Sequence, residues 1–385
     1  MYITKMKIIN WRNFKSEEVD FSEITYILGP NAAGKSNFLE VFRFLRDVSK
    51  PQGGGLQQAL SDRGGLSKVR CFAARKNPQV GIEVTLSETI NGAPKWRYVL
   101  LLAQETRGKR QAYVAKEQVF SFEKGIYLLD RPNDEDKQDR ERLTQTALEQ
   151  INANADFREI AAFFADVLYL HLVPQLLKHG NELAVKKMTS DPFGQEFLEN
   201  IARTPEKTRS SRLKRIENIL KNAIHDLQEL SFDRDDTGTP HLQIRYSHWR
   251  AHGGFQQESD FSDGTLRLIA LVWTLLESNS VILLEEPELS LHKKIIEQIP
   301  GLIQKARQTR KKTGGQILIS THSEAMLSSP VISGNYLILT PSPNGEGTRI
   351  GKPSSDDLSA MAAGMTPAEI MLPQTETTIG ELDIV

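Results

Sequence analysis

The first fifty residues carry two apolar patterns, one typical of strands and one typical of a helix. Apolar residues alternate with polar ones from the N-terminus, and the apolar run ITYIL (24–28) stops at a glycine, so we expect two strands here. Leu39, Phe42 and Leu45 then recur at the spacing of a buried helix face, in a helix that begins at Ser36. The sequence therefore predicts strand, turn, strand, loop and helix in that order.

The middle of the chain changes from strand-like to helical periodicity. VGIEVTL (80–86) and WRYVLLLA (96–103) are separated by an Asn-Gly turn signal, which predicts a small antiparallel sheet. The run RPNDEDKQDRER (131–142) is nearly all polar, so we expect an exposed loop or the start of a helix. Beyond residue 143, two sets of apolar residues recur at helical spacing: Phe157, Ile160, Phe164 and Leu168, then Leu213, Ile216, Leu220, Ile224 and Leu227.

Strand-like and helical segments alternate again after residue 240. The predicted strands are LQIRY (242–246), VILLEE (281–286), QILIST (316–321) and YLILT (336–340), with helices from Thr265 and from about Leu291 between them. Such alternation predicts a mostly parallel sheet covered by helices. The tail from about Asp356 is loosely patterned.

These patterns together predict an α/β protein with an antiparallel β lobe and a helical insertion. We expect residues 1–142 and 236–345 to form the two parts of the main domain, residues 143–235 to form the insertion, and residues 346–385 to form a C-terminal tail.

Composition narrows the class of protein but names no partner. The chain has 385 residues, of which 39% are hydrophobic and 25% charged, with a net charge of -1. Cys71 is the only cysteine, which excludes an internal disulfide framework and a cysteine-rich zinc site. The N-terminus lacks the apolar core of a signal peptide, and no run of 18 apolar residues occurs. We therefore expect a cytoplasmic protein with no membrane partner.

The segment GPNAAGKS (29–36) satisfies the P-loop pattern G-x-x-x-x-G-K-[ST], with a predicted strand before it and a helix after it. In such a loop Gly29 and Gly34 let backbone amides turn toward phosphate oxygens, Lys35 reaches the terminal phosphates and the Ser36 hydroxyl ligates magnesium. A glycine-rich turn with a chance lysine is the alternative, and the flanking strand and helix favour the P-loop. The sequence thus predicts ATP and Mg²⁺ as cofactors.

An acidic strand end is expected near the magnesium of a P-loop site. The strand VILLEE ends in two carboxylates, which would be costly at the end of a buried strand without a cation or water beside them. We expect Glu285 to hold the ion through a water molecule and Glu286 to polarise the water that attacks the γ-phosphate. An exposed acidic turn after a core strand is the alternative.

Four motifs in order carry a resemblance to a known family: GPNAAGKS, FSDGTLRLIAL (261–271), VILLEEPELSLH (281–292 with Ser280 before it) and QILISTHS (316–323). This set resembles the ABC-type ATPase heads of the SMC and RecF families, and most closely the compact OLD-like ATPases of bacterial anti-phage systems. The resemblance covers residues 1–100 and 240–345. It implies an α/β P-loop NTPase head of the ABC type that works as a homodimer with ATP between the two heads. A higher oligomer is the alternative to the dimer.

The resemblance assigns further residues to the nucleotide. Ser262, Asp263 and Gly264 match the signature motif that contacts the γ-phosphate held by a partner's P-loop. Alone, SDGT is an ordinary helix cap and turn. His322 matches the switch histidine that contacts the γ-phosphate, so Lys35, Glu286 and His322 are the expected catalytic residues. Leu289, Ser290 and His292 resemble the loop through which one head senses the other.

Further nucleotide contacts are expected around the P-loop and near the N-terminus. In the P-loop they are Gly29, Pro30, Asn31, Ala32, Ala33, Gly34, Lys35, Ser36 and Asn37. WRNFKS (11–16) resembles the segment beside the base and phosphates, which nominates Arg12, Asn13 and Lys15 for contacts and Trp11 or Phe14 for stacking. Core aromatics beside surface charges are the alternative. The family's glutamine loop is expected between residues 52 and 85, where neither Gln57, Gln58 nor Gln79 fits a strand end.

Two departures from the family pattern affect the expected activity. Glu285 stands where many relatives have aspartate, so hydrolysis is expected to be slow if the longer side chain alters the magnesium geometry. OLD proteins continue into a TOPRIM nuclease, whereas this sequence ends at Val385, so we expect a separate effector protein to supply any nuclease.

The leading hypothesis is a dimeric ATPase that acts as sensor, scaffold or regulator of an effector, a nuclease or toxin, in anti-phage defence. The runner-up is a RecF-type or SMC-like repair ATPase that clamps DNA. Basic segments at 207–221 and 307–312 could contact nucleic-acid phosphates, and a solvated helix face is the alternative for each. An enzyme with another substrate ranks third and a membrane-transport ATPase subunit fourth.

Overall fold

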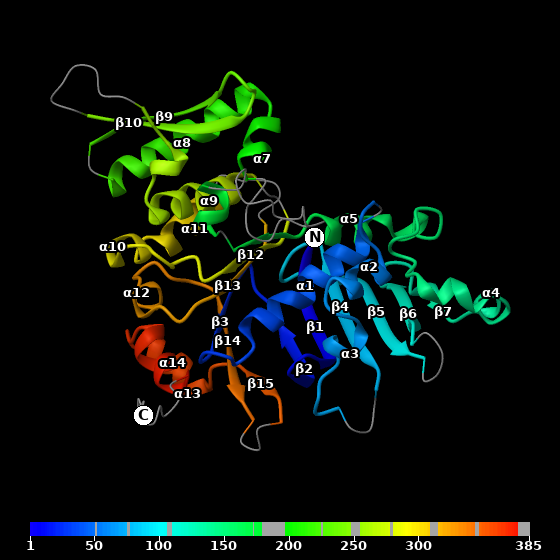
Figure 1. The fold of residues 1–385 in the computed structure, drawn as a ribbon. Helices are drawn as coiled ribbons and strands as arrows, with labels where there is room; N and C mark the ends of the chain where they lie inside the picture. Colours follow the sequence, from blue (N-terminus) through cyan, green and yellow to red (C-terminus); the bar gives the residue numbers. More distant parts are fainter. Residues whose placement is uncertain are drawn as a thin grey trace, which may run out of the picture.

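The fold is built from two six-stranded sheets and a three-stranded sheet, with helices between and around them (Figure 1). The computed structural model describes residues 1–50, 52–74, 78–105, 110–171, 173–178, 197–224, 226–247, 255–277, 280–308, 315–342 and 346–375. No helix among these residues combines the length and the apolar character needed to cross a bilayer.

The predicted mostly parallel sheet is confirmed, and it forms the centre of the molecule. Its order is β15-β14-β3-β13-β12-β8, and every neighbouring pair is parallel except β14 with β15. Its strands are β3 (Ile24–Leu28), β8 (Leu168–Leu170), β12 (Ile282–Glu285), β13 (Ile317–Ser320), β14 (Asn335–Pro341) and β15 (Thr348–Gly351). The middle strands are aliphatic runs because helices cover both of their faces.

The antiparallel sheet is larger than the small sheet predicted, because the first two strands of the chain join it. Its order is β2-β1-β4-β5-β6-β7. Its strands are β1 (Tyr2–Trp11), β2 (Phe14–Asp20), β4 (Val80–Ser87), β5 (Pro94–Gln104), β6 (Ala112–Ser121) and β7 (Ile126–Arg131). Short-range patterns detect the β4–β5 hairpin, but the pairing of β1 with β4 is a contact between distant segments.

Helix α1 (Lys35–Ser49) packs between these two sheets and joins them into one core. Its apolar face carries the predicted Leu39, Phe42 and Leu45, all of them buried. Trp11 from β1 packs against Phe44 of α1 with ring centroids 5.1 Å apart. Smaller helices complete this core: α2 (Leu56–Ser61), α3 (Leu66–Val69), η2 (Ala155–Phe157) and α5 (Arg158–Ala165). The helix that follows the P-loop is therefore held rigidly from both sides.

The segment predicted to be a helical insertion also contributes strands, so the helical interpretation was wrong at Leu168 and Leu227, and Ile224 lies just beyond a helix in extended conformation. Leu168 lies in β8, which pairs with β12, and Leu227 begins β9 (Leu227–Arg234) rather than extending α8 (Glu206–Ala223). Apolar spacing over so few residues does not separate a strand from a helix. The rest of this region comprises α6 (Pro174–Lys178), α7 (Phe197–Arg203), β10 (Pro240–Tyr246), β11 (Phe255–Gln257) and η3 (Glu258–Asp260).

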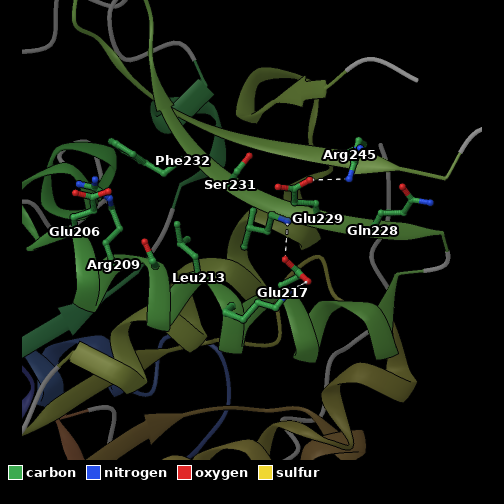
Figure 2. A pocket seen from close by; sticks show the side chains of 12 residues that line it. Glu206, Arg209, Leu213, Glu217, Gln228, Glu229, Ser231, Phe232 and Arg245 are labelled. Atoms are coloured by element: carbon green, nitrogen blue, oxygen red, sulfur yellow. Dashed lines mark hydrogen bonds and ion pairs between the residues drawn. The ribbon is translucent and has the colours of Figure 1, made fainter. Parts of the chain in front are cut away.

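The strands β9, β10 and β11 form a separate antiparallel sheet that lies with α7 and α8 at one end of the molecule (Figure 1). Residues of α8 and β9 line a groove of 490 Å³. Figure 2 shows Arg209, Leu213 and Glu217 of α8 on one side of this groove and Ser231 and Phe232 of β9 on the other.

The C-terminal part of the described chain is more ordered than its loose pattern predicted. The helices α13 (Ser355–Ala362) and α14 (Pro367–Thr375) fold there, and Met371 of α14 is fully buried beside the central sheet. Residues 376–385 lie outside the described residues. The face of the central sheet on which Met371 packs is also covered by α9 (Asp263–Glu277), α10 (Lys293–Ile296), α11 (Ile299–Gln308) and α12 (Glu324–Leu327).

The polar run at 131–142 contains the start of a helix, which was one of the two predicted alternatives, and a buried ion-pair cluster that its polar pattern did not indicate. Arg131 donates to both carboxylate oxygens of Asp136, at 3.0 and 2.8 Å, and to Glu117 at 3.2 Å. The pKa of Glu117 is raised by burial, against the lowering effect of the Ala147 amide and Arg131. The remainder of this run forms α4 (Asp134–Gln138) and η1 (Arg140–Thr144). Arg131 thus anchors this segment to β6.

Replacing Arg131 tests that anchor. Arg131→Met leaves two carboxylates buried without their cation, which costs about 3–5 kcal/mol of unfolding free energy. The matched control is Lys137→Met, because Lys137 in the same run pairs with Asp134 while 69% of its side chain is exposed. We expect that control to cost less than about 1 kcal/mol. Urea unfolding of both variants measures the difference, and equal losses would contradict the buried anchor.

Candidate nucleotide-binding site

The P-loop spans residues 29–36, between the end of β3 and the first turn of α1. Gly34 has φ 99°, and a Cβ built there would lie 2.1 Å from the Asn13 Nδ2 atom, so only glycine fits. Lys35 donates its Nζ to the carbonyl oxygens of Gly29 and Pro30 at 2.8 and 3.2 Å. Burial lowers the pKa of Lys35, against the raising effect of Glu286, Glu288 and Glu285. The loop therefore surrounds the Lys35 ammonium group, at the position that the P-loop motif predicts for it.

Asn13 supports the P-loop from behind. Its Nδ2 donates to the Ala33 carbonyl at 2.9 Å and to the Thr348 hydroxyl at 2.7 Å, and its Oδ1 accepts from Asn37 at 3.0 Å. Thr348 also donates to the Ala33 carbonyl at 2.8 Å. The polar atoms of Asn13 are thus engaged by the loop itself. Thr348 of β15 lies in the region predicted as a tail, and no sequence pattern marked it.

The aromatic residues near the N-terminus belong to the core, so the stacking role predicted for them was wrong. Trp11 and Phe14 have 0% exposed surface, and the Trp11 Nε1 donates to the Asn37 carbonyl at 3.0 Å. Arg12 adopts φ 52° and donates to the Lys68 carbonyl at 3.1 Å, while Lys15 pairs with Glu346 at 3.0 Å. The pattern of a core aromatic beside surface charges, which was the alternative, describes this segment.

The carboxylate expected to hold magnesium lies beside the P-loop serine. Glu285 is the last residue of β12, and the Ser36 hydroxyl donates to its Oε1 atom. The Tyr169 hydroxyl donates to its Oε2 atom at 2.5 Å, and the Arg43 guanidinium lies 4.3 Å from the centre of the Tyr169 ring. A hydroxyl and a carboxylate at one point are the hard oxygen ligands that Mg²⁺ prefers. The donor set therefore fits the expected ion.

Tyr169 is a site residue that the sequence did not reveal. It lies on β8, which pairs in parallel with β12 so that both strands end at the same edge of the sheet. Burial and the neighbouring Glu285 carboxylate raise the pKa of Tyr169, so its hydroxyl stays a donor. The only available signal was a tyrosine in a short apolar run, which gives no hint of the strand it pairs with.

The structure brings the expected catalytic carboxylate and histidine together. Glu286 adopts φ 44°, donates its amide to the Ser320 carbonyl at 3.0 Å, and places its Oε1 atom 3.5 Å from the His322 Nδ1 atom. Residues with positive φ are strained unless they are glycine, and such strain concentrates at functional sites. Arg12, Ala32 and Ser290 also have positive φ.

A third carboxylate, Glu288, lies behind this pair. It is buried and accepts from the Thr321 hydroxyl at 2.5 Å and from the His322 amide at 3.4 Å. Burial raises the pKa of Glu288, against these hydrogen bonds and the nearby His322. Glu288 therefore holds the backbone that carries His322, a role that the pattern EEPE did not reveal.

The signature motif caps α9. The Ser262 Oγ accepts from the Thr265 amide at 3.1 Å, which is the geometry of an N-cap. A Cβ at Gly264 would lie 2.7 Å from the Ser290 carbonyl, so the motif packs directly on the loop that contains Ser290 and His292. Within the described part of the chain, no hydrogen bond or ion pair joins residues 262–264 to the P-loop.

The glutamines between residues 52 and 85 form hydrogen bonds with residues outside the central sheet. Gln57 donates to the Ala112 and Thr144 carbonyls, Gln58 donates to Asp62, and the Gln79 carbonyl accepts from Asn10. The strand beside β12 is β8, and the glutamine that follows it is Gln175. Gln175 donates to Asp263 at 2.9 Å. The glutamine loop therefore stays unassigned, since the hydrogen bonds given for Gln57, Gln58 and Gln175 in the described ranges do not involve Glu285.

Sequence comparisons agree with this geometry. Residues 24–328 match the model of the family described as "AAA domain, putative AbiEii toxin, Type IV TA system". The DNA replication and repair protein RecF of Lactobacillus gasseri is 26% identical over 222 residues, which are 57% of this chain and 54% of that protein. RecF of Acaryochloris marina is 31% identical over 87 residues, 22% of this chain and 23% of that protein. The matches thus span at most 54% of these relatives.

Solved structures of SMC heads share the fold. An SMC head bound to the C-winged helix domain of ScpA superimposes with a TM-score of 0.53 at 13% identity, over 93% of this chain and 100% of that one. A Pyrococcus furiosus Smc head bound to the C-terminal domain of ScpA gives 0.50 at 12% identity, over 94% and 98%. At these identities the likeness concerns the fold alone. The chain belongs to the AAA family that its residues 24–328 match, and it has the fold of an SMC head.

Proposed function

We propose that the protein binds ATP with Mg²⁺ and hydrolyses it. The observation that carries this proposal is the hydrogen bond from Ser36 to Glu285, which joins the P-loop to the acidic strand end where Glu286 and His322 lie. Bound Mg²⁺ would be held by Ser36 and Glu285 and would neutralise charge on the phosphates. Lys35 leaves the carbonyls of its own loop to contact the terminal phosphates, which offer it stronger, charged acceptors.

Glu286 and His322 act on the water and the γ-phosphate. The Glu286 carboxylate orients the attacking water and accepts its proton as a general base. His322, which follows the neighbouring strand, contacts the γ-phosphate. The backbone of Glu286 is fixed because its amide donates a hydrogen bond to the Ser320 carbonyl, and this contact supports its positive φ. Lengthening the metal ligand from aspartate to glutamate makes the reaction slow, since the Glu285 carboxylate stands one methylene further from β12.

The catalytic unit that we propose is a homodimer with two ATP molecules between the heads. Each signature motif, residues 262–264, would contact the γ-phosphate in the other head. The capped start of α9 supports this arrangement, because it offers backbone amides to an anion and, among the residues that the structure describes, is not bonded to its own P-loop. Two of the solved SMC heads are bound to domains of ScpA, which supports the proposal that this head also binds a partner protein.

We further propose that the dimer regulates an effector in anti-phage defence, as in the OLD-like ATPases. The family description names a putative toxin of a type IV toxin–antitoxin system, which favours a role in such systems. The groove between α8 and β9 gives an effector a concave surface far from the nucleotide, with Arg209 stacked 4.3 Å over Phe232 at its wall (Figure 2). The segment 143–235 is the proposed effector-binding part.

A RecF-like DNA clamp is the second candidate, and the RecF alignments favour it. The charges of α8 support it less. Lys214 and Lys221 pair with Glu217 at 2.7 and 2.6 Å, and Arg212 lies over Trp273. Arg307 of the second basic segment pairs with Glu23 at 2.7 Å, and residues 309–312 lie outside the described residues. Cations already paired release fewer counterions when they meet phosphates.

Glu286→Gln separates hydrolysis from assembly. Glutamine keeps the shape but accepts no proton, so we expect phosphate release to fall by about a hundredfold or more. ATP-dependent dimerisation should persist in light scattering. Glu324→Gln is the matched control, because Glu324 is an exposed carboxylate two residues after His322. Normal hydrolysis by Glu286→Gln would refute the assigned role.

Tyr169→Phe tests the support of Glu285. Loss of the hydroxyl leaves one Glu285 oxygen without its donor, so we expect the Mg²⁺ concentration for half-maximal hydrolysis to rise about tenfold. Tyr336→Phe is the control, since Tyr336 is a buried tyrosine of the same sheet, stacked on Tyr26. Magnesium titration of ATPase activity distinguishes the two variants. An unchanged requirement in Tyr169→Phe would mean that the hydroxyl does not position the ligand.

The two candidate functions differ in their response to DNA. A RecF-like clamp requires duplex DNA to raise ATP hydrolysis and requires DNA binding to weaken steeply with salt. We expect neither effect, because the basic residues of α8 are largely paired. Fluorescence anisotropy with labelled duplex at two salt concentrations measures binding. If exposed Lys207 and Arg215 carry such binding, Lys207→Gln with Arg215→Gln will abolish it and the clamp will replace the effector hypothesis.

A further inference from the structure

The signature aspartate is held by two side chains of α6. Lys178 contacts one Asp263 carboxylate oxygen with its Nζ at 3.0 Å, and Gln175 donates its Nε2 to the other at 2.9 Å. The Lys178 side chain is 16% exposed and that of Asp263 is 34% exposed. Both oxygens of the Asp263 carboxylate therefore bind side chains of α6.

Helix α6 is itself fixed on three sides. It follows β8, whose Tyr169 is bonded to Glu285, and it packs against α9 and η3. Arg267 lies one turn along α9 from Asp263, yet Lys178 is the one cation within ion-pair distance of Asp263 in the described ranges. Neutralisation of Asp263 thus depends on a residue from another element, placed by the sheet.

A free carboxylate at this position would oppose phosphate binding. Asp263 is the first residue of α9, where unpaired amides attract an anion. An unrestrained aspartate can turn to these amides itself, and its charge repels a second anion at short range. Ser262 already caps the Thr265 amide, so the helix needs no further cap. When α6 holds the Asp263 carboxylate, the remaining amides at the start of α9 stay free to bind an anion. Lys178 also neutralises the charge of that carboxylate.

We propose that Lys178, with Gln175, is a positioning residue that neutralises Asp263 and keeps the start of α9 open to the γ-phosphate of ATP bound by a second copy of this chain. The inference rests on the proposed ATP-sandwiched dimer and adds to it the element that prepares the signature motif. Among the described residues, Lys178 pairs with Asp263 and with no P-loop residue, so we expect it to affect assembly rather than the binding of ATP to each P-loop.

The test uses the full chain with Glu286→Gln, which retains bound ATP. Into it are introduced Lys178→Met, Asp263→Asn and both together, with Lys178→Arg as the charge-conserving variant. Lys221→Met is the control, since Lys221 forms a comparable ion pair with Glu217 on α8. Light scattering gives the ATP concentration for half-maximal dimerisation, a fluorescent ATP analogue gives binding to the monomer, and thermal unfolding checks folding.

We expect Lys178→Met to raise the ATP concentration for dimerisation by about tenfold while monomer binding stays the same. Lys178→Arg and Lys221→Met should behave as the parent does. The double variant should dimerise at the concentration that Asp263→Asn alone requires, because removing the carboxylate charge removes the need for a cation. A purely structural role for Lys178 would not be rescued in this way.

The remaining outcomes separate two failures. If the Glu286→Gln parent does not dimerise with ATP, the proposed function fails and this inference fails with it. If the parent dimerises and Lys178→Met does so at the same ATP concentration, the inference is overturned and the proposed function stands. Equal impairment of Lys178→Met and the double variant assigns Lys178 to packing and also overturns the inference.

Discussion

The parallel pairing of β3, β13 and β12 is the constraint on which the site depends. Parallel strands end at the same edge of a sheet, so the P-loop after β3, His322 after β13 and Glu285 at the end of β12 meet there. The hydrogen bond from Ser36 to Glu285 spans this edge. A slip of register in any of these strands would separate the serine from the carboxylate, because residues on neighbouring strands are placed by their ladder hydrogen bonds.

The packing of α1 makes the P-loop at that edge of the sheet rigid. The helix is enclosed by both large sheets, and its aromatic residues contact β1, so its first turn has little freedom. Asn13 from the turn between β1 and β2, and Thr348 from β15, hold the Ala33 carbonyl. Segments near both ends of the described chain thus support one turn of backbone. Asn13, which was expected to contact the nucleotide, thus also shapes the loop, and its contact with the nucleotide stays a prediction.

Buried carboxylates recur in the molecule, and each is stabilised by named partners. Glu117 and Asp136 share Arg131, Glu217 binds two lysines and the Leu230 amide, and Glu288 binds Thr321. Buried charge is costly unless it is paired, so these groups specify how distant segments meet. At the candidate site the carboxylates of Glu285 and Glu286 lie beside the P-loop, where a bound cation would neutralise their charge.

The sequence by itself determined the α/β class, the P-loop, the acidic strand end and the order of the four motifs, because each of these depends on residues close together in the chain. Leu39, Phe42 and Leu45 repeat at helical spacing whatever surrounds them. The tertiary structure alone decided that Leu168 begins a strand, that Trp11 is a core residue and that Tyr169, Thr348 and Lys178 reach the site. These facts depend on which distant segments pair, and local spacing carries no information about that pairing.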